Sequence, residues 1–153
     1  MREINGQINA KGMKIAIVVS RFNSFFTEQL LKGAVDCFLR HEGADEDLTT
    51  VRVPGANEAP VVVSKLASSD NYDAVVVLGA VIQGATPHAD LINGTVSRAL
   101  ANIAIACEKP ILNGIVCAQN LEQAIERSGT KQGNKGWDAV MTAIETIAVM
   151  KSL

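Results

Sequence analysis

Four short apolar segments restrict what this chain can fold into more than any single motif does. The first and third, MKIAIVVS and YDAVVVLGAVI, are nearly continuous runs rich in β-branched residues. Strands covered on both faces have this character, whereas strands with one wet face alternate polar and apolar residues. We therefore expect these two strands to be buried. The second segment, DLTTVRVPG, alternates polar and apolar residues and stops at a Pro-Gly turn signal. The four strands are predicted at residues 13–20, 47–55, 72–82 and 109–118.

Segments with helical spacing follow each of these strands. Pro60 is compatible with the first turn of the second helix, and Gly94 is a mild interruption of the third. Asn120 and Gln123 have the spacing of a capping box at the fourth. The helices are predicted at residues 24–43, 57–70, 86–109, 120–129 and 136–153. Repeated strand–helix units predict an α/β fold, a three-layer αβα sandwich with a four-stranded parallel sheet and helices on both faces.

Composition narrows the class of protein. A length of 153 residues predicts a single domain over residues 1–153. A net charge of −2 gives no general attraction to nucleic acid or to an anionic membrane. No apolar run reaches the ~20 residues that span a bilayer, and the first residues lack the apolar centre of a signal peptide. Three cysteines without metal-ligand spacing predict no metal site and a reduced, cytoplasmic setting.

The carboxyl ends of the strands are where ligands bind in open α/β sheets, so residues there are candidate site residues. Phe22 follows the first strand, and a loop phenylalanine can stack on a flat heterocycle while Asn23 offers a donor and an acceptor. Taken alone, that segment favours the alternative that Phe22 packs under the next helix. Glu58 stands near a helix start, where the helix dipole favours a carboxylate. It could equally accept hydrogen bonds from a polyol ligand.

The third strand is followed by GATPH, residues 84–88. Its small residues allow backbone N–H groups at a helix start to approach an anion, and Thr86 adds a hydroxyl. His88 falls in the first helical turn, and its side chain suits proton transfer in both directions. The alternative is a solvent-exposed or helix-capping histidine. Neither G-x-x-x-x-G-K-[ST] nor G-x-G-x-x-G occurs, which disfavours nucleotide binding.

Residues 126–136, ERSGTKQGNKG, are predicted to form a cationic, glycine-bearing loop between two helices. Arg127, Lys131 and Lys135 are spaced four apart, and the planar guanidinium matches phosphate geometry. The alternative is a solvated basic loop, and a phosphate site requires that this loop meets GATPH in space. A Ser-His-Asp or Cys-His nucleophile stays open, although no motif supports one.

Taken together, SRFN, VPGANEAP, LGAVIQGATPHAD and NLEQAIERSGTKQGNKG stand in the order and spacing of the 6,7-dimethyl-8-ribityllumazine synthases, and the chain resembles this family over nearly its whole length. The resemblance implies a flavodoxin-like fold and a transferase of riboflavin biosynthesis. The family condenses 5-amino-6-ribitylaminouracil with 3,4-dihydroxy-2-butanone 4-phosphate, releases phosphate and needs no cofactor. Its members assemble as pentamers, often twelve of them in an icosahedral shell of 60 subunits, with active sites between adjacent chains.

The resemblance also implies roles for individual residues. His88 would transfer protons, Arg127 would act with it on the phosphate, and Phe22 would stack on the pyrimidine. The other substrate-binding positions surround these three. Asn23, Ala56, Asn57 and Glu58 lie on the ribityl side, Val81 and Ile82 at the pyrimidine edge, Gly84, Ala85 and Thr86 at the phosphate, and Asn113 and Lys135 at the subunit interface.

Four positions differ from the usual family pattern. Asn57 and Asn113 stand where aromatics are common, Gln83 where Arg is common, and Ala89 where Phe or Tyr is common. Each replacement is smaller or uncharged, and losing one aromatic contact of ~0.5–1.5 kcal/mol weakens binding by up to about tenfold. These differences motivate a second hypothesis, a shell-forming or ligand-binding homologue with weak or lost catalysis. A third hypothesis is a regulatory α/β domain that binds an unrelated phosphorylated ligand.

Overall fold

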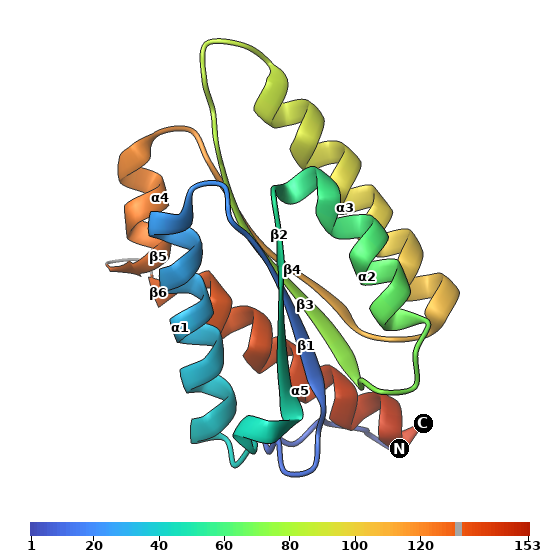
Figure 1. Ribbon diagram of the computed structural model, residues 1–153. Coiled ribbons are helices and arrows are strands. Elements are labelled where there is room, and N and C mark those ends of the chain that lie inside the picture. Colours follow the sequence, from blue (N-terminus) through green and yellow to red (C-terminus); the bar gives the residue numbers. More distant parts are fainter. Residues whose placement is uncertain (131–132) are drawn as a thin grey trace.

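A four-stranded parallel sheet forms the centre of the molecule in the computed structural model, which describes residues 1–130 and 133–153. The strand order is β2-β1-β3-β4 (Figure 1). The two central strands are buried along almost their whole length, and the edge strands are partly exposed. The predicted parallel sheet is therefore confirmed, with β1 at Ile15–Ser20, β2 at Leu48–Val53, β3 at Ala74–Ile82 and β4 at Ile111–Ala118.

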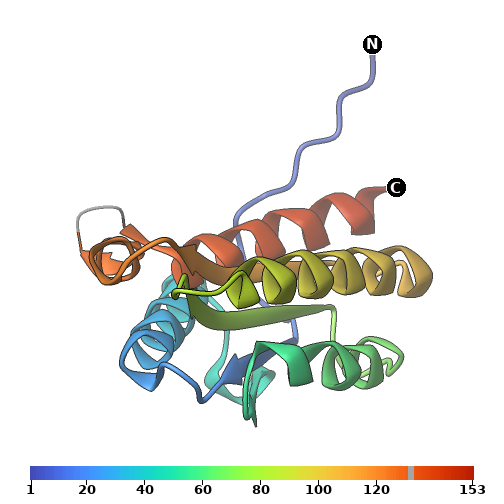
Figure 2. The same cartoon turned by 90° about the horizontal axis from the view of Figure 1, so that it is seen from above.

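Helices cover both faces of this sheet and complete the three predicted layers (Figures 1 and 2). Helices α1 and α5 share one apolar cluster with alternate strand residues such as Ile17 and Leu78. Helices α2 and α3 share the other, with Val18 and Val77. None of the described helices is long and apolar enough to cross a membrane. The helices are α1 (Ser24–Arg40), α2 (Ala59–Ala67), α3 (His88–Cys107), α4 (Leu121–Arg127) and α5 (Lys135–Ser152), with short 3-10 turns η1 (Asp45–Asp47) and η2 (Ala56–Glu58).

Most helix starts were predicted correctly from capping residues and proline positions in the sequence. Asn120 caps α4 by accepting a hydrogen bond from the Gln123 amide at 2.9 Å, and the Gln123 side chain reaches back to the Gln119 amide. Pro60 lies in the first turn of α2, where its missing N–H costs nothing. Gly94 does not interrupt α3, which is continuous over 20 residues.

The prediction of a glycine-bearing loop between two helices at residues 126–136 is wrong in part, because both ends of this range belong to helices and two short strands lie within it. Strand β5 (Ser128–Thr130) pairs antiparallel with β6 (Gly133–Asn134), and α5 begins directly afterwards. Gly129 and Gly133 adopt positive φ angles of 118° and 77°, which other residues rarely reach, so these glycines permit the reversal. The predicted position of Lys131 lies outside the described residues.

Helices α1 and α5 approach each other closely because small residues lie at their contact. A Cβ atom added to Gly136 would overlap the backbone carbonyl of Leu30. Beside it, the Asn134 side chain caps α5 by accepting from the Gly136 and Trp137 amides. The same side chain donates to the Gln29 carbonyl of α1 at 2.9 Å. Asn134 and Gly136 thus fix the start of α5 against the middle of α1.

We expect Gly136→Ala to destabilise the protein, because neither backbone at the contact can move away without disturbing the core. Overpacking of this kind costs about 1–3 kcal/mol and lowers the Tm by about 3–10 °C. Gly94→Ala is the matched control, since a Cβ at that helical position meets nothing within 4 Å. It should leave the Tm unchanged or raise it slightly. Equal effects of the two variants in thermal denaturation would contradict the close-contact interpretation.

Candidate active site at the carboxyl edge of the sheet

A cavity of about 410 Å³ opens at the carboxyl ends of β1 and β3, between η2 and the start of α3. Its volume falls in the range of small-molecule sites. Three of the four strand ends contribute to it, which brings together residues that are far apart in the sequence. The predicted residues among its lining are Phe22, Asn23, Ala56, Asn57, Glu58, Val81, Ile82, Gly84, Thr86 and His88.

Phe22 lies at the rim of this cavity with 71% of its surface exposed. The interpretation that it packs under the next helix is therefore wrong. Phe26, one helical turn further on, fills the buried position and is 5% exposed. The Phe22 amide donates to the Pro54 carbonyl at 3.0 Å, which joins the loops that follow β1 and β2. An exposed aromatic ring at the mouth of a cavity offers a flat ligand a stacking surface.

Asn23 has a structural task in addition to its place in the cavity. Its backbone is left-handed, with φ 60° and ψ 44°, a conformation that asparagine tolerates better than most residues. Its side-chain amide donates to the Ala80 carbonyl at 2.7 Å. This bond ties the end of β1 to β3 and leaves the side-chain oxygen of Asn23 as the acceptor that a ligand could use.

Glu58 lies both at the start of α2 and in the cavity wall, so the two roles considered for it are compatible. It is the last residue of η2, and α2 begins at the next residue. Its carboxylate is exposed and comes close to Gly55, where an added Cβ would lie 3.0 Å from Oε2. A free carboxylate at this position can accept hydrogen bonds from hydroxyl groups of a ligand.

His88 is the first residue of α3 and lines the cavity from an exposed position. The preceding residue, Pro87, gives this helix no side-chain cap. By contrast, Asn120 and Asn134 cap the starts of α4 and α5. The amides of the first turn of α3 are therefore open to a ligand beside the imidazole.

The loop before His88 is shaped by Gln83, one of the positions that depart from the family pattern. Its side chain donates to the Thr86 carbonyl at 3.1 Å, and its amide donates to the Ala118 carbonyl at 2.8 Å. Ala85 lies in this loop but does not line the cavity. Ala89, another departure, is 5% exposed and forms part of the cavity wall, so its small side chain leaves room there.

The remaining predicted residues lie elsewhere on the chain. Asn113 and Lys135 line a second cavity of about 210 Å³ beside β4, and the Asn113 side chain accepts from the Ile115 amide at 3.0 Å. Arg127 is exposed at the end of α4, where it donates to Gln123 Oε1 at 3.3 Å. Burial raises the pKa of the Cys117 thiol, while Lys135 and Arg127 partly counter this. Both cations are thus close enough to Cys117 to favour its charged form.

Within one chain, Arg127 does not join the GATPH segment at the first cavity, because neither Arg127 nor Lys135 lines it. The two described cations of the predicted loop therefore do not complete a phosphate site at this cavity within a single chain. The predicted residues instead form two separate groups, one at the carboxyl ends of β1 and β3 and one at the β4 edge.

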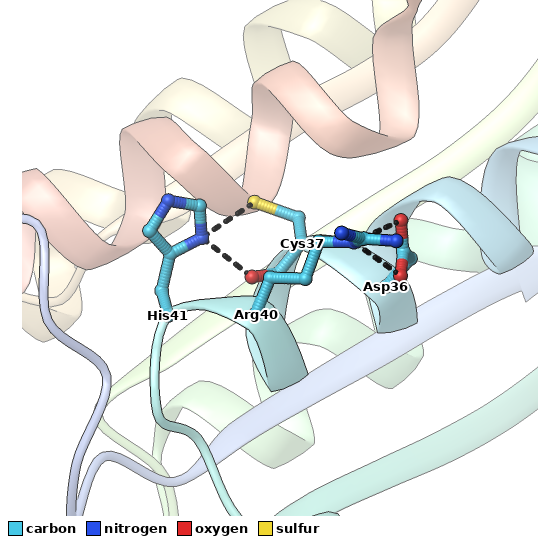
Figure 3. Close-up of polar contacts among 4 residues, drawn as sticks. All are labelled: Asp36, Cys37, Arg40 and His41. Carbon is cyan, nitrogen blue, oxygen red and sulfur yellow. Dashed lines mark hydrogen bonds and ion pairs between the residues drawn. The ribbon is translucent and has the colours of Figure 1, made fainter.

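The second histidine belongs to a structural pair with Cys37 (Figure 3). His41 Nδ1 donates to the Cys37 carbonyl at 2.6 Å and lies 3.7 Å from the Cys37 sulfur. Its ring packs edge-on against Trp137, with centroids 5.8 Å apart. Burial raises the pKa of the Cys37 thiol to about 11, and Asp138 and Asp36 add to the shift. This pair caps the end of α1, about 25 Å of helix from the cavity, and does not form an activated nucleophile.

Sequence reasoning missed several residues that line the first cavity. Ser20 ends an apolar strand, and a polar residue there has no distinguishing spacing. Ile92 follows Ala89 at helical spacing and was indistinguishable from a core residue. The missed lining residues are Ser20, Gly55, Ala80 and Ile92.

A parallel sheet with a cavity at its carboxyl edge, and a histidine at a helix start beside that cavity, defines a flavodoxin-like α/β domain with a cavity of the size that small-molecule sites have. Comparison with known proteins specifies the family. The family profile described as 6,7-dimethyl-8-ribityllumazine synthase matches residues 12–151. The 6,7-dimethyl-8-ribityllumazine synthase of Aquifex aeolicus (strain VF5) is 49% identical over 153 residues, which are 100% of this chain and 99% of that protein. The chain belongs to the 6,7-dimethyl-8-ribityllumazine synthase family.

We expect Cys37 to resist thiol reagents in the native protein, because its thiol is buried and holds its proton. At pH 8, iodoacetamide should leave Cys37 unmodified, whereas all three cysteines should react in urea, as peptide mapping by mass spectrometry would show. The unfolded thiol ionises near ~8.5, below the folded value of about 11, so the stability contributed by the neutral thiol is complete below pH ~8.5 and is lost as pH rises toward 11. Native modification of Cys37 at the unfolded rate would contradict this burial.

Proposed function

We propose that the protein is a lumazine synthase of riboflavin biosynthesis. It condenses 5-amino-6-ribitylaminouracil with 3,4-dihydroxy-2-butanone 4-phosphate to 6,7-dimethyl-8-ribityllumazine and releases phosphate. The observation that carries this proposal is the shared cavity of Phe22, Glu58 and His88, which come from three different strand ends. A stacking surface, a polyol acceptor and a proton-transfer group are what these two substrates require.

The pyrimidine is proposed to stack on Phe22 and to bond the backbone of β3. Strand β3 continues past its last pair with β1, Val19 with Leu78, so its carboxyl end has an edge that β1 does not cover. Asn23 uses the Ala80 carbonyl on that edge. Ile82, two residues later, directs its own backbone groups to the same side and hence toward the cavity. The exposed Glu58 carboxylate then accepts hydrogen bonds from the ribityl hydroxyls.

The phosphate is proposed to lie at the start of α3. The open amides of this helix start, with Gly84 and the Thr86 hydroxyl, suit an oxyanion. A departing phosphate also needs a cation, and the first cavity holds none in its described lining. We propose that a neighbouring copy of the chain supplies Arg127 and Lys135. The working form is then a homo-oligomer, either a pentamer or a closed shell of 60 subunits.

His88 is proposed to move the protons of the reaction. Imine formation between the amine and the ketone requires a proton for the departing water, and the loss of phosphate requires removal of a carbon-bound proton. An imidazole at the cavity wall can do both in turn. Holding two substrates side by side contributes much of the remaining rate acceleration.

We favour the enzyme over the scaffold hypothesis because His88 and Phe22 are retained and share one cavity. The wild-type protein with both substrates should form lumazine, measured by its absorbance, above the uncatalysed rate. His88→Ala should lower kcat by about 10²–10⁴-fold with little change in KM. His41→Ala is the control, since that histidine is structural, and it should keep kcat at temperatures below its Tm. Wild-type turnover no faster than background at saturating substrate would overturn the proposal.

A mixed oligomer tests whether the site is shared between chains. His88→Ala and Arg127→Ala chains should each be nearly inactive alone, and Arg127→Ala should raise the KM of the phosphorylated substrate far more than that of the pyrimidine. After the two variants are unfolded together and refolded, random assortment leaves about a quarter of the sites intact, so activity should return. Light scattering should show an assembly of at least five 16.2 kDa chains. Failure of the mixture to regain activity would show that both residues act within one chain.

A further inference from the structure

We propose that Ser20 binds the heterocyclic substrate through its hydroxyl group and contributes to substrate specificity. The inference rests on the proposed function, because it names a further contact within the same cavity. Ser20 is the last residue of β1, is buried, and lines the same cavity as Asn23 and Ala80.

Burial of the Ser20 side chain is the first observation behind this proposal. Ser20 is 3% exposed and is one of three buried polar residues in the described part of the chain, with Thr27 and Ser128. Ser128 satisfies its hydroxyl by donating to the Ala124 carbonyl at 2.7 Å. The Ser20 hydroxyl has no hydrogen-bond partner within the described chain, and its oxygen is not one of the fully buried unpaired atoms, which are Thr27 Oγ1 and Asn93 Oδ1. Because Ser20 lines the cavity, its oxygen is in contact with that space. A ligand that fills the cavity would cover this hydroxyl, and covered hydroxyls are nearly always paired, so a polar group of the ligand is its natural partner.

The direction of the side chain is the second observation. Ser20 follows Ala16 and Val18 at strand spacing, and those residues face α2 and α3 in one apolar cluster. The Ser20 side chain therefore points to the same face of the sheet as these apolar residues, at the end of the strand where the cavity opens. Gly79 on β3 leaves room for it, since an added Cβ would lie 3.1 Å from Ser20 Oγ. A polar group is thus accommodated at the floor of the cavity, and nothing in the described structure uses it.

Because of its position, Ser20 is expected to contact the heterocycle and not the phosphate. Ser20 is two residues from the exposed ring of Phe22, whereas the phosphate is proposed to lie beyond the end of β3 at the start of α3. A hydroxyl can donate to a ring carbonyl or accept from a ring amine. A ligand without a matching polar atom would leave this hydroxyl buried and unpaired, so the contact discriminates against less polar rings.

Ser20→Ala tests the contact by removing one oxygen atom. Isothermal titration with 5-amino-6-ribitylaminouracil should show a Kd about three- to tenfold higher than for the wild type. The KM for the phosphorylated substrate should stay within about twofold. Thr27→Val is the control, because Thr27 is likewise a buried hydroxyl residue of the described structure but lies outside the cavities described above, with its Oγ1 buried and unpaired. It should leave the Kd unchanged.

The outcomes separate this inference from the proposed function. If the wild type does not bind the pyrimidine, the proposed function fails and the Ser20 contact fails with it. If the wild type binds and Ser20→Ala binds equally well, only the contact is overturned. A lower Tm with an unchanged Kd would show that the hydroxyl serves the fold. A raised Kd without a lower Tm supports the contact.

Discussion

Burial of β1 and β3 on both faces is the constraint on which the rest of the structure depends. Strands covered on both sides need helical crossovers, and crossovers make the strands parallel. Parallel strands place all their carboxyl ends at one edge of the sheet, and the cavity forms there. The same run of valines that stabilises the core therefore determines where Phe22, Glu58 and His88 can meet.

Differences in strand length then determine which backbone groups are unpaired at the cavity. Strand β3 has nine residues and β1 has six, so the end of β3 extends past its neighbour. Backbone groups that would be paired inside a sheet remain available there, and Asn23 uses one of them to hold the turn into α1. Polar contacts from main chain are less easily lost by substitution than those from side chains. The departures at Asn57 and Ala89 thus alter the walls of the cavity and leave this edge unchanged.

The strands and most helix starts could be predicted from the sequence, because they depend on residues that are close together in the chain. The family could be predicted because recognisable motifs carry it. The β-branched runs predicted the strands, and the Asn120 cap predicted the start of α4, because both signals are local. The exposure of Phe22 could not be predicted, since the core accepts Phe26 instead and the sequence does not show which of the two rings packs there. Ser20 was missed because burial beside a cavity has no sequence signal. The separation of Arg127 from His88 within one chain is a long-range property of packing and could not be read from spacing.

The hydrogen bonds of Asn134 that join α1 and α5 have a consequence for assembly. Helix α1 begins beside the cavity, α5 begins at Lys135, and Asn134 joins the two helices through Gln29. The two groups of site residues are thereby held at a fixed angle on one rigid body. If each chain offers one group to the neighbour on one side and the other group to the neighbour on the opposite side, that angle determines the rotation between successive chains. The number of chains that closes a ring then depends on helix packing inside the subunit as well as on the surfaces that touch.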